Sequence, residues 1–261
     1  MREAPVIFLG VPIPEKQNPV IVLFTNSKIR VSGEIEYNLN KCSDMIRGNV
    51  SRGVKEYVGS FISRLSRELD MNACFNINIE VSDNLRHLIS SIYVVATHIL
   101  VEAILGKESM NMDPEDLAKA LIVIDRSVDM RSQYIEALRF ATALSKSLVF
   151  RRGDEFIKIR NPPIIERLDV KKIYRLKMIP DTYLGGELGD LLTKLVGYTL
   201  LKASQELIEE SYDKFLETAR LINRYWSLIH GLPMTNKHYI YDPQNRVALT
   251  DVKLLVNKPR S

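Results

Sequence analysis

The residues whose types and spacing could do chemistry gather where a predicted strand meets a long apolar helix. Arg86, His87, Ser90 and Ser91 follow the alternating stretch 75–81 and open that helix. A helix N-terminus presents unpaired backbone N–H groups that bind anions, and cationic or hydroxyl side chains add further donors. These four residues are therefore candidates for holding a phosphate group, and the two serines are candidates for a Mg²⁺ contact.

Each candidate also has a plainer interpretation. Serines in the first turns of a buried helix bond to backbone carbonyls, which is the interpretation we favour for Ser90 and Ser91. His87 has no visible acid or nucleophile beside it, so a polar loop histidine is favoured over a catalytic base. His98 lies on an otherwise apolar helix and is expected to be a satisfied core histidine.

A second group of charged residues, Asp125, Arg126, Asp129 and Arg131, lies between two predicted helices. Its functional interpretation is a Mg²⁺ or phosphate contact. Its plainer interpretation is ion pairing at the surface, which contributes little to stability, and we favour that one. The chain carries no Walker loop, nucleophile elbow, HExxH or GxGxxG motif.

Composition excludes several classes of function. The 261 residues are 46% apolar and 26% charged with a net charge of +4, as in an ordinary globular protein. The basic pairs Arg151-Arg152 and Lys171-Lys172 lack interleaved aromatic residues, so nucleic-acid binding is not expected. The longest apolar run, 89–105, is broken by polar side chains and predicts a buried helix, not a membrane span.

The cysteines bear on metal binding and location. Cys42 and Cys74 are the only cysteines and form no CxxC motif, so a structural zinc site is not expected. So few cysteines, together with no secretory signal, predict a cytoplasmic protein.

Periodicity and turn residues predict the elements that must position these residues. In the first part of the chain we expect a strand at 5–9, strands at 19–24 and 28–36 joined by a turn at 25–27, a helix at 50–69, a strand at 74–81, a helix at 84–105 capped by Ser82 or Asp83, a helix begun by Asp113-Pro114, a helix at 133–142, and a hairpin at 148–159. Asn161-Pro162-Pro163 predicts a boundary between lobes at 1–160 and 161–261. Beyond it we expect a strand at 172–179, helices at 188–203 and 205–229, and two or three short strands at 238–256.

This order of elements over residues 1–160 resembles the N-terminal half of the GHMP small-molecule kinases, such as mevalonate kinase, and of the related diphosphomevalonate decarboxylases. The resemblance is carried by strand 75–81, the helix start at 88–92 and the helix start at 113–118. The family's phosphate loop, Pro-x-x-x-Gly-Leu-Gly-Ser-Ser-Ala, aligns with 83–92. The resemblance implies an α+β, two-lobed fold with a ribosomal protein S5 domain 2-like N-terminal lobe and a reduced α/β C-terminal lobe.

The chain departs from the family pattern at the residues that matter chemically. In the phosphate loop Leu88 and both serines match, whereas the proline, both glycines and the alanine do not. Glycine lets a backbone approach an anion closely, and His87 and Ile89 replace it here, so their side chains would lie where the triphosphate should be.

Two further family elements are altered. The Gly-Gly pair aligns with the segment 144–149, which has Lys and Ser instead. At the family's catalytic aspartate the nearest carboxylate is Glu136. The segment 241–245 resembles the decarboxylases' Asp-Ala-Gly-Pro-Asn, although a simple turn is the favoured interpretation.

The leading hypothesis is a GHMP-kinase-like protein with a degenerate nucleotide loop that is non-catalytic and binds a small-molecule ligand or a protein partner. The alternative is a divergent, active ATP-dependent kinase or decarboxylase of a small metabolite, such as a mevalonate-pathway intermediate. Only this alternative calls for ATP and Mg²⁺; otherwise the cofactor is unknown. It would use Glu136 and Lys146 in catalysis and Arg86, His87, Ser90 and Ser91 around the cofactor. A nucleic-acid or assembly module is the least favoured, no membrane partner is expected, and a homodimer is allowed.

Overall fold

The structure is a computed structural model that describes residues 1–10, 18–37, 45–106, 112–153, 156–168, 173–176, 186–234, 238–242, 246–250 and 252–255. Several residues discussed above, namely Cys42, Asp154, Lys171, Lys172 and the segment 243–245, lie outside these ranges.

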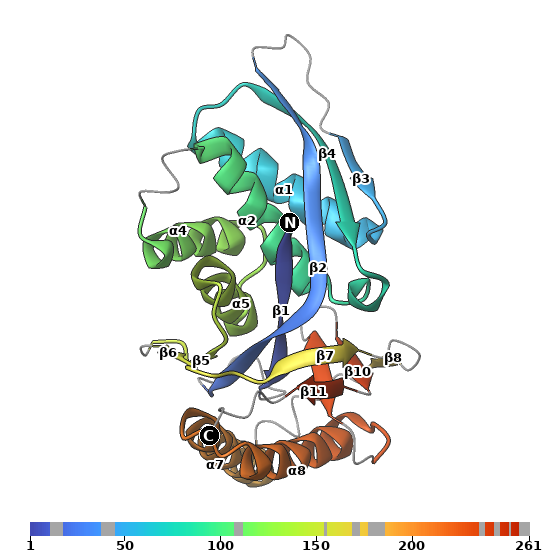
Figure 1. Ribbon diagram of the computed structural model, residues 1–261, viewed down its shortest axis with the longest axis vertical. Coiled ribbons are helices and arrows are strands. Elements are labelled where there is room, and N and C mark those ends of the chain that lie inside the picture. Colours follow the sequence, from blue (N-terminus) through green and yellow to red (C-terminus); the bar gives the residue numbers. More distant parts are fainter. Residues whose placement is uncertain are drawn as a thin grey trace.

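A single sheet of eleven strands forms the centre of the molecule (Figure 1). Its strands are β1 (Arg2–Leu9), β2 (Val20–Tyr37), β3 (Met45–Gly48), β4 (Ala73–Val81), β5 (Leu148–Phe150), β6 (Ile157–Lys158), β7 (Ile164–Leu168), β8 (Ile173–Arg175), β9 (Tyr239–Asp242), β10 (Val247–Thr250) and β11 (Val252–Leu255). The strand order along the sheet is β11-β7-β2-β1-β9-β10-β8. Strand β4 pairs with the C-terminal part of β2 and also with β3. Most strand pairs are antiparallel, including β1–β2 and the predicted pair β5–β6.

The predicted turn at residues 25–27 is wrong. Strand β2 runs unbroken through these residues, and the hairpin is made by β1 and β2 instead. Between the paired residues Glu3–Lys28 and Pro5–Phe24, strand β2 contains two more residues than strand β1. The polar residues of β2 in this interval therefore form a bulge. The hydroxyl of Thr25 accepts a hydrogen bond from the backbone N–H of Ser27 at 3.1 Å, which satisfies that donor within the bulge.

Four helices lie together beside the sheet, and two more lie at one end of the molecule (Figure 1). The group of four is α1 (Arg52–Glu68), α2 (Ile89–Leu105), α4 (Pro114–Ser127) and α5 (Gln133–Leu144), and the end pair is α7 (Glu187–Ile208) and α8 (Tyr212–His230). Helix α2 contacts both the sheet and its neighbouring helices, and most of its residues are buried, as its largely apolar sequence predicts. Asp113 caps α4 as predicted, by accepting a hydrogen bond from the backbone N–H of Glu115 at 2.7 Å.

Helix α2 begins later than the sequence predicts. The segment Asp83–Leu85 forms a short 3₁₀ turn, and the α-helix starts only at Ile89. Neither Ser82, before the turn, nor Leu88, the helix N-cap, supplies a side-chain cap. The first N–H groups of α2 therefore depend on partners from elsewhere in the chain.

The last hundred residues share the sheet with the first part of the chain. Strand β7 pairs with β2 and β9 pairs with β1, so the division at residue 160 into lobes stays a prediction. The two C-terminal helices break at residues 209–211, later than the predicted break near Ser204. Three short strands close the chain, as expected. Trp226 of α8 is buried and donates from its indole N–H to the carbonyl of Gly10 at 2.9 Å, which holds α8 against the end of β1.

None of the helices in the described ranges has the length and apolar character needed to cross a membrane.

Candidate functional site at the start of helix α2

The N-terminus of α2 is capped by a carboxylate from the far end of the chain. The backbone N–H of Ser90 donates to Oδ2 of Asp242 at 2.8 Å, and the Ser90 hydroxyl donates to Oδ1 of the same residue at 2.5 Å. Ser90 and Asp242 are both buried, with 2% and 1% of their surface exposed. The carboxylate thus takes the place of the missing local cap.

This arrangement satisfies the helix electrostatically. The N-terminus of a helix carries a partial positive charge, and a carboxylate there is stabilising, most of all where water is excluded. Asp242 is the last residue of strand β9. This strand pairs with β1, and its placement there brings the carboxylate to α2. The site that a phosphate would use at this helix start therefore holds an anion supplied by the protein itself.

The other residues predicted near this site lie differently. Arg86 is exposed and pairs with Asp83 at 2.7 Å, and His87 is also exposed. Ile89 is half-buried and lies beside Gly53 at the start of α1. Ser91 is buried in the first turn of the helix. Of these residues, Ser90 contacts the capping carboxylate.

Glu136 lies in a cluster of charges on α5. It is 4% exposed, and its carboxylate accepts hydrogen bonds from Arg126 at 2.9 Å and from Arg152 at 3.0 Å. Two guanidinium groups therefore hold a nearly buried carboxylate.

Lys146 lies just beyond the C-terminal end of α5, after the cap Ser145, whereas Glu136 lies in the first turn of that helix. Lys146 is exposed and lines a cavity of about 290 Å³ together with Arg2, Arg160 and neighbouring apolar side chains. The roles assigned to Glu136 and Lys146 stay predictions.

The backbone before Lys146 adopts a conformation that glycine favours. Ser145, the C-cap of α5, has φ 50° and ψ 41°, which is the left-handed conformation. A side chain is strained there, whereas glycine is not.

A buried ion pair joins helices α4 and α5. Arg139 donates to both carboxylate oxygens of Asp125, at 2.7 Å each, and both side chains are fully buried. The same guanidinium donates to the carbonyl of Val94 at 2.8 Å and to the hydroxyl of Thr97 at 2.7 Å, so it ties α5 to α2 and α4. The Tyr93 hydroxyl donates to Asp125 at 2.6 Å.

Asp125 is a core residue, so the interpretation of it as part of a surface ion pair is wrong. Arg139 is not among the residues that the sequence singles out. Burial alone would lower the pKa of Arg139, but the charge and hydrogen bonds of Asp125 outweigh it and raise that pKa. The signal that could have revealed the network is the placement of Arg139 on the apolar face of an otherwise buried helix.

Three histidines, His98, His230 and His238, are buried, and burial lowers the pKa of His98 and of His238. His98 is 1% exposed, its Nε2 lies 3.5 Å from Glu102, and its Nδ1 has no hydrogen-bond partner, so the expected satisfaction is incomplete. Burial lowers its pKa. Burial also lowers the pKa of His238 to about 4, with a smaller contribution from the charge of Arg220. Within the residues that the structure describes, no group of three His, Cys, Asp or Glu side chains is arranged to hold a metal ion.

The sheet and the helices that cover it form an α+β fold of the class seen in the GHMP small-molecule kinases. Comparison with solved structures supports this assignment. Mevalonate kinase from L. major, determined with R-mevalonate, superimposes with a TM-score of 0.65 at 11% identity, over 96% of this chain and 85% of that one. The chain therefore has the GHMP-kinase fold, as the order of its elements predicted.

Other neighbours agree. A Lin0012 protein from Listeria innocua gives a TM-score of 0.63 at 7% identity, over 95% of this chain and 88% of that one. Phosphomevalonate kinase from Streptococcus pneumoniae gives 0.58 at 9% identity, over 95% and 89%. No protein-family model matches the sequence, and a comparison with curated proteins gives no match. At these identities the likeness concerns the fold.

Proposed function

We propose that this protein is a non-catalytic ligand-binding or partner-binding protein built on the GHMP-kinase fold. The observation that carries the proposal is the carboxylate of Asp242 on the backbone N–H and hydroxyl of Ser90. In the kinase family the corresponding loop is expected to hold the phosphates of a nucleotide. A triphosphate brought to the same N–H would meet a buried negative charge, and two anions repel each other strongly where water is excluded.

The residues around the helix start do not fit a bound nucleotide in other respects. Ser90, which the resemblance assigns to the phosphates, uses both its donors on Asp242. Arg86 is paired with Asp83. Glu136 is held between two arginines in the first turn of α5, whereas Lys146 lies beyond the C-terminal end of that helix.

Nucleotide binding tests the proposal directly. The purified protein is heated with and without millimolar Mg·ATP, and its unfolding temperature is measured. A ligand at 100 times its Kd stabilises the folded state by about 2.7 kcal/mol, which such a measurement detects easily. We expect no stabilisation. Nucleotide-dependent stabilisation that Ser90→Ala removes would overturn the proposal.

The alternative function, a divergent ATP-dependent kinase or decarboxylase, draws support from the fold likeness to mevalonate and phosphomevalonate kinases over most of the chain. It requires Asp242 to move away from Ser90 when the nucleotide arrives. Incubation with Mg·ATP and mevalonate, or mevalonate phosphates, separates the two functions. Turnover within the ordinary enzyme range, about 1 s⁻¹ or faster, establishes the alternative.

A further inference from the structure

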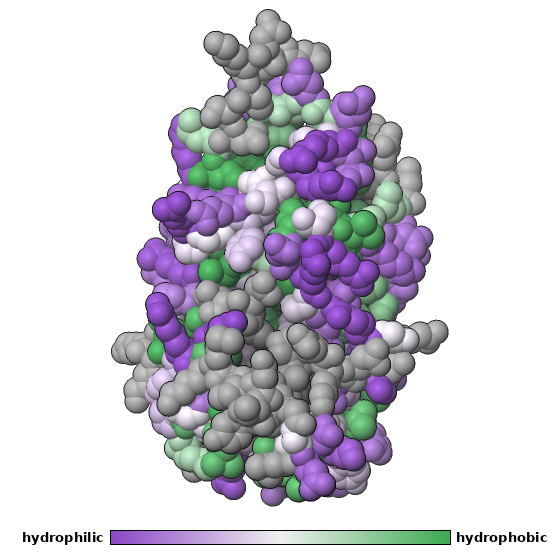
Figure 2. Space-filling view, turned by 180° about the vertical axis from the view of Figure 1, so that it is seen from behind, coloured by the Kyte–Doolittle hydropathy of each residue, from purple (hydrophilic) through white to green (hydrophobic). Residues whose placement is uncertain are grey.

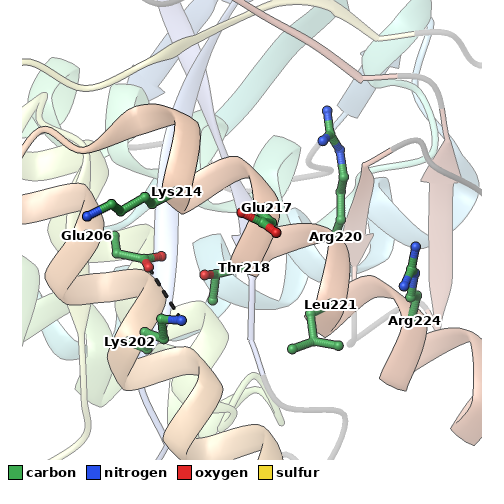
Figure 3. Close-up of a pocket in the computed structure, with 8 residues that line it drawn as sticks. All are labelled: Lys202, Glu206, Lys214, Glu217, Thr218, Arg220, Leu221 and Arg224. Carbon is green, nitrogen blue, oxygen red and sulfur yellow. Dashed lines mark ion pairs between the residues drawn. The ribbon is translucent and has the colours of Figure 1, made fainter.

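A groove of about 940 Å³ runs between the two C-terminal helices (Figure 3). It is lined from both helices by Lys202, Glu206, Lys214, Glu217, Thr218, Arg220, Leu221 and Arg224. All these residues belong to α7 and α8, whereas Ser90 and Asp242 belong to α2 and β9. The groove is therefore a separate feature from the start of α2. Its volume is in the range of sites for small molecules.

One end of the groove, beside Lys202 and Lys214, holds a buried carboxylate that lacks a complete set of partners (Figure 3). Glu206 is 7% exposed, and its Oε2 atom has no hydrogen-bond partner. Its Oε1 atom lies 3.8 Å from Nζ of Lys202, which is within ion-pair range but beyond a hydrogen bond. Thr218, also buried, projects from the facing helix next to it (Figure 3). A buried acceptor without a donor is costly, so this position favours a molecule that donates to it.

The rim of the groove is basic. Four basic and two acidic side chains line it. Lys214, Arg220 and Arg224 are exposed, and none of them makes an ion pair in the part of the chain that the structure describes. Basic side chains on a surface are ordinarily solvated. Here Arg220 and Arg224 lie at the opposite end of the groove from the buried carboxylate of Glu206 (Figure 3), so that end attracts an anion and the Glu206 end calls for a hydrogen-bond donor.

We propose that the groove binds a small phosphate ester that also carries a hydroxyl or ammonium group. The phosphate lies against Arg220 and Arg224, and the donor lies against Glu206 and Thr218. Free phosphate leaves the carboxylate unpaired and binds more weakly, and a sugar without a phosphate leaves the cations unpaired. This inference goes beyond the proposed function and does not depend on how the start of α2 behaves.

Calorimetric titration of the full chain with three probes tests the proposal. Glucosamine 6-phosphate carries both required groups, inorganic phosphate carries one, and glucosamine carries the other. We expect glucosamine 6-phosphate to bind at least 10-fold more tightly than inorganic phosphate, and glucosamine not to bind. Equal affinity for glucosamine 6-phosphate and inorganic phosphate indicates an adventitious ion only and overturns the proposal, as does the absence of binding by all three.

Variants locate the site. Glu206→Gln keeps the shape of the side chain but removes its charge, so it should weaken glucosamine 6-phosphate about 10-fold while leaving inorganic phosphate unchanged. Arg224→Ala removes an exposed cation and should weaken both phosphate probes. Lys194→Ala removes an exposed cation of α7 outside the groove and should change nothing. Ser90→Ala should also change nothing, which separates this test from that of the proposed function. Binding insensitive to both Glu206→Gln and Arg224→Ala would overturn the assignment.

Discussion

The carboxylate of Asp242 accepts two hydrogen bonds from Ser90, one from the backbone N–H at 2.8 Å and one from the hydroxyl, across 152 residues of chain. The contact ties the strand β9 to the start of α2. It gives the helix a cap that its own neighbouring residues do not provide, and it supplies an anion at the position where the kinase fold is expected to receive one.

The first prediction concerns this cap. Asp242→Ala should lower the free energy of unfolding by about 2 to 3 kcal/mol, because it removes hydrogen bonds to a charged acceptor and leaves a buried N–H unpaired. The vacated helix start should then bind an added anion. Urea unfolding of the variant should show stabilisation by millimolar sulfate that the unchanged protein lacks. Equal sulfate dependence in both proteins would contradict the capping role.

The second prediction concerns the buried pair Asp125–Arg139. Asp125→Ala leaves a fully buried guanidinium without its counter-ion, so the free energy of unfolding should fall by about 3 to 5 kcal/mol. Asp116→Ala breaks an exposed pair with Lys119 on the same helix and should cost less than about 1 kcal/mol. Chemical denaturation of both variants checks the contrast, and similar losses in the two would rule out the core role of Asp125.

The double variant Asp125→Leu with Arg139→Met should recover much of that loss, because it removes both charges together. A double variant as unstable as Asp125→Ala alone would show that the shapes and hydrogen bonds of the two side chains matter more than their charges.

The third prediction concerns pH. The pKa of His238 is lowered to about 4 in the folded protein, whereas the unfolded chain has the ordinary value near 6.5. The unfolded state therefore takes up the proton first, and the stability contributed by neutral His238 is complete above pH 6.5 and lost as the pH falls toward 4. The loss attributable to this residue should reach about 3 kcal/mol.

Urea unfolding between pH 4 and 7.5 checks this expectation. His238→Gln keeps a polar group beside the Asn223 amide, which lies 3.4 Å from Nδ1 of His238, but it cannot titrate. The variant should lose stability less steeply with falling pH than the unchanged protein. His87→Gln, at an exposed position, serves as the control and should keep the original slope. Parallel curves for His238→Gln and the unchanged protein would contradict the pKa.

The fourth prediction concerns Ser145. Its φ of 50° is strained for serine and relaxed for glycine, so Ser145→Gly should raise the free energy of unfolding by about 0.5 to 1 kcal/mol. Ser132, the extended N-cap of α5, accepts a hydrogen bond from the backbone N–H of Ile135, and Ser132→Gly should give no such gain. Thermal unfolding of the two variants measures the difference, and destabilisation by Ser145→Gly would show that the side chain contributes more than the backbone strain costs.

Much of the architecture was accessible from local patterns. The alternation in β4, the three-and-four spacing of α1, the continuous apolar run of α2 and the Asp113-Pro114 helix start all predicted elements that the structure contains. Element order was enough to predict the fold class, because consecutive elements pack beside one another in a limited number of ways. The misses at residues 25–27 and at the start of α2 share a cause, since pairing with another strand or a distant side chain overrode local turn and cap preferences.

By itself the sequence determined the fold, the buried central helix and the replacement of the family's glycines, because these depend on residue type and near-neighbour spacing. Only the tertiary structure decided what occupies the start of α2 and where the buried charges pair. The capping anion comes from Asp242, which local reasoning assigned to a turn, and the partner of Asp125 is Arg139 on another helix. Both pairings join residues on different helices or strands. They form because polar groups are buried against one another, and this burial exists only once the sheet and helices have assembled.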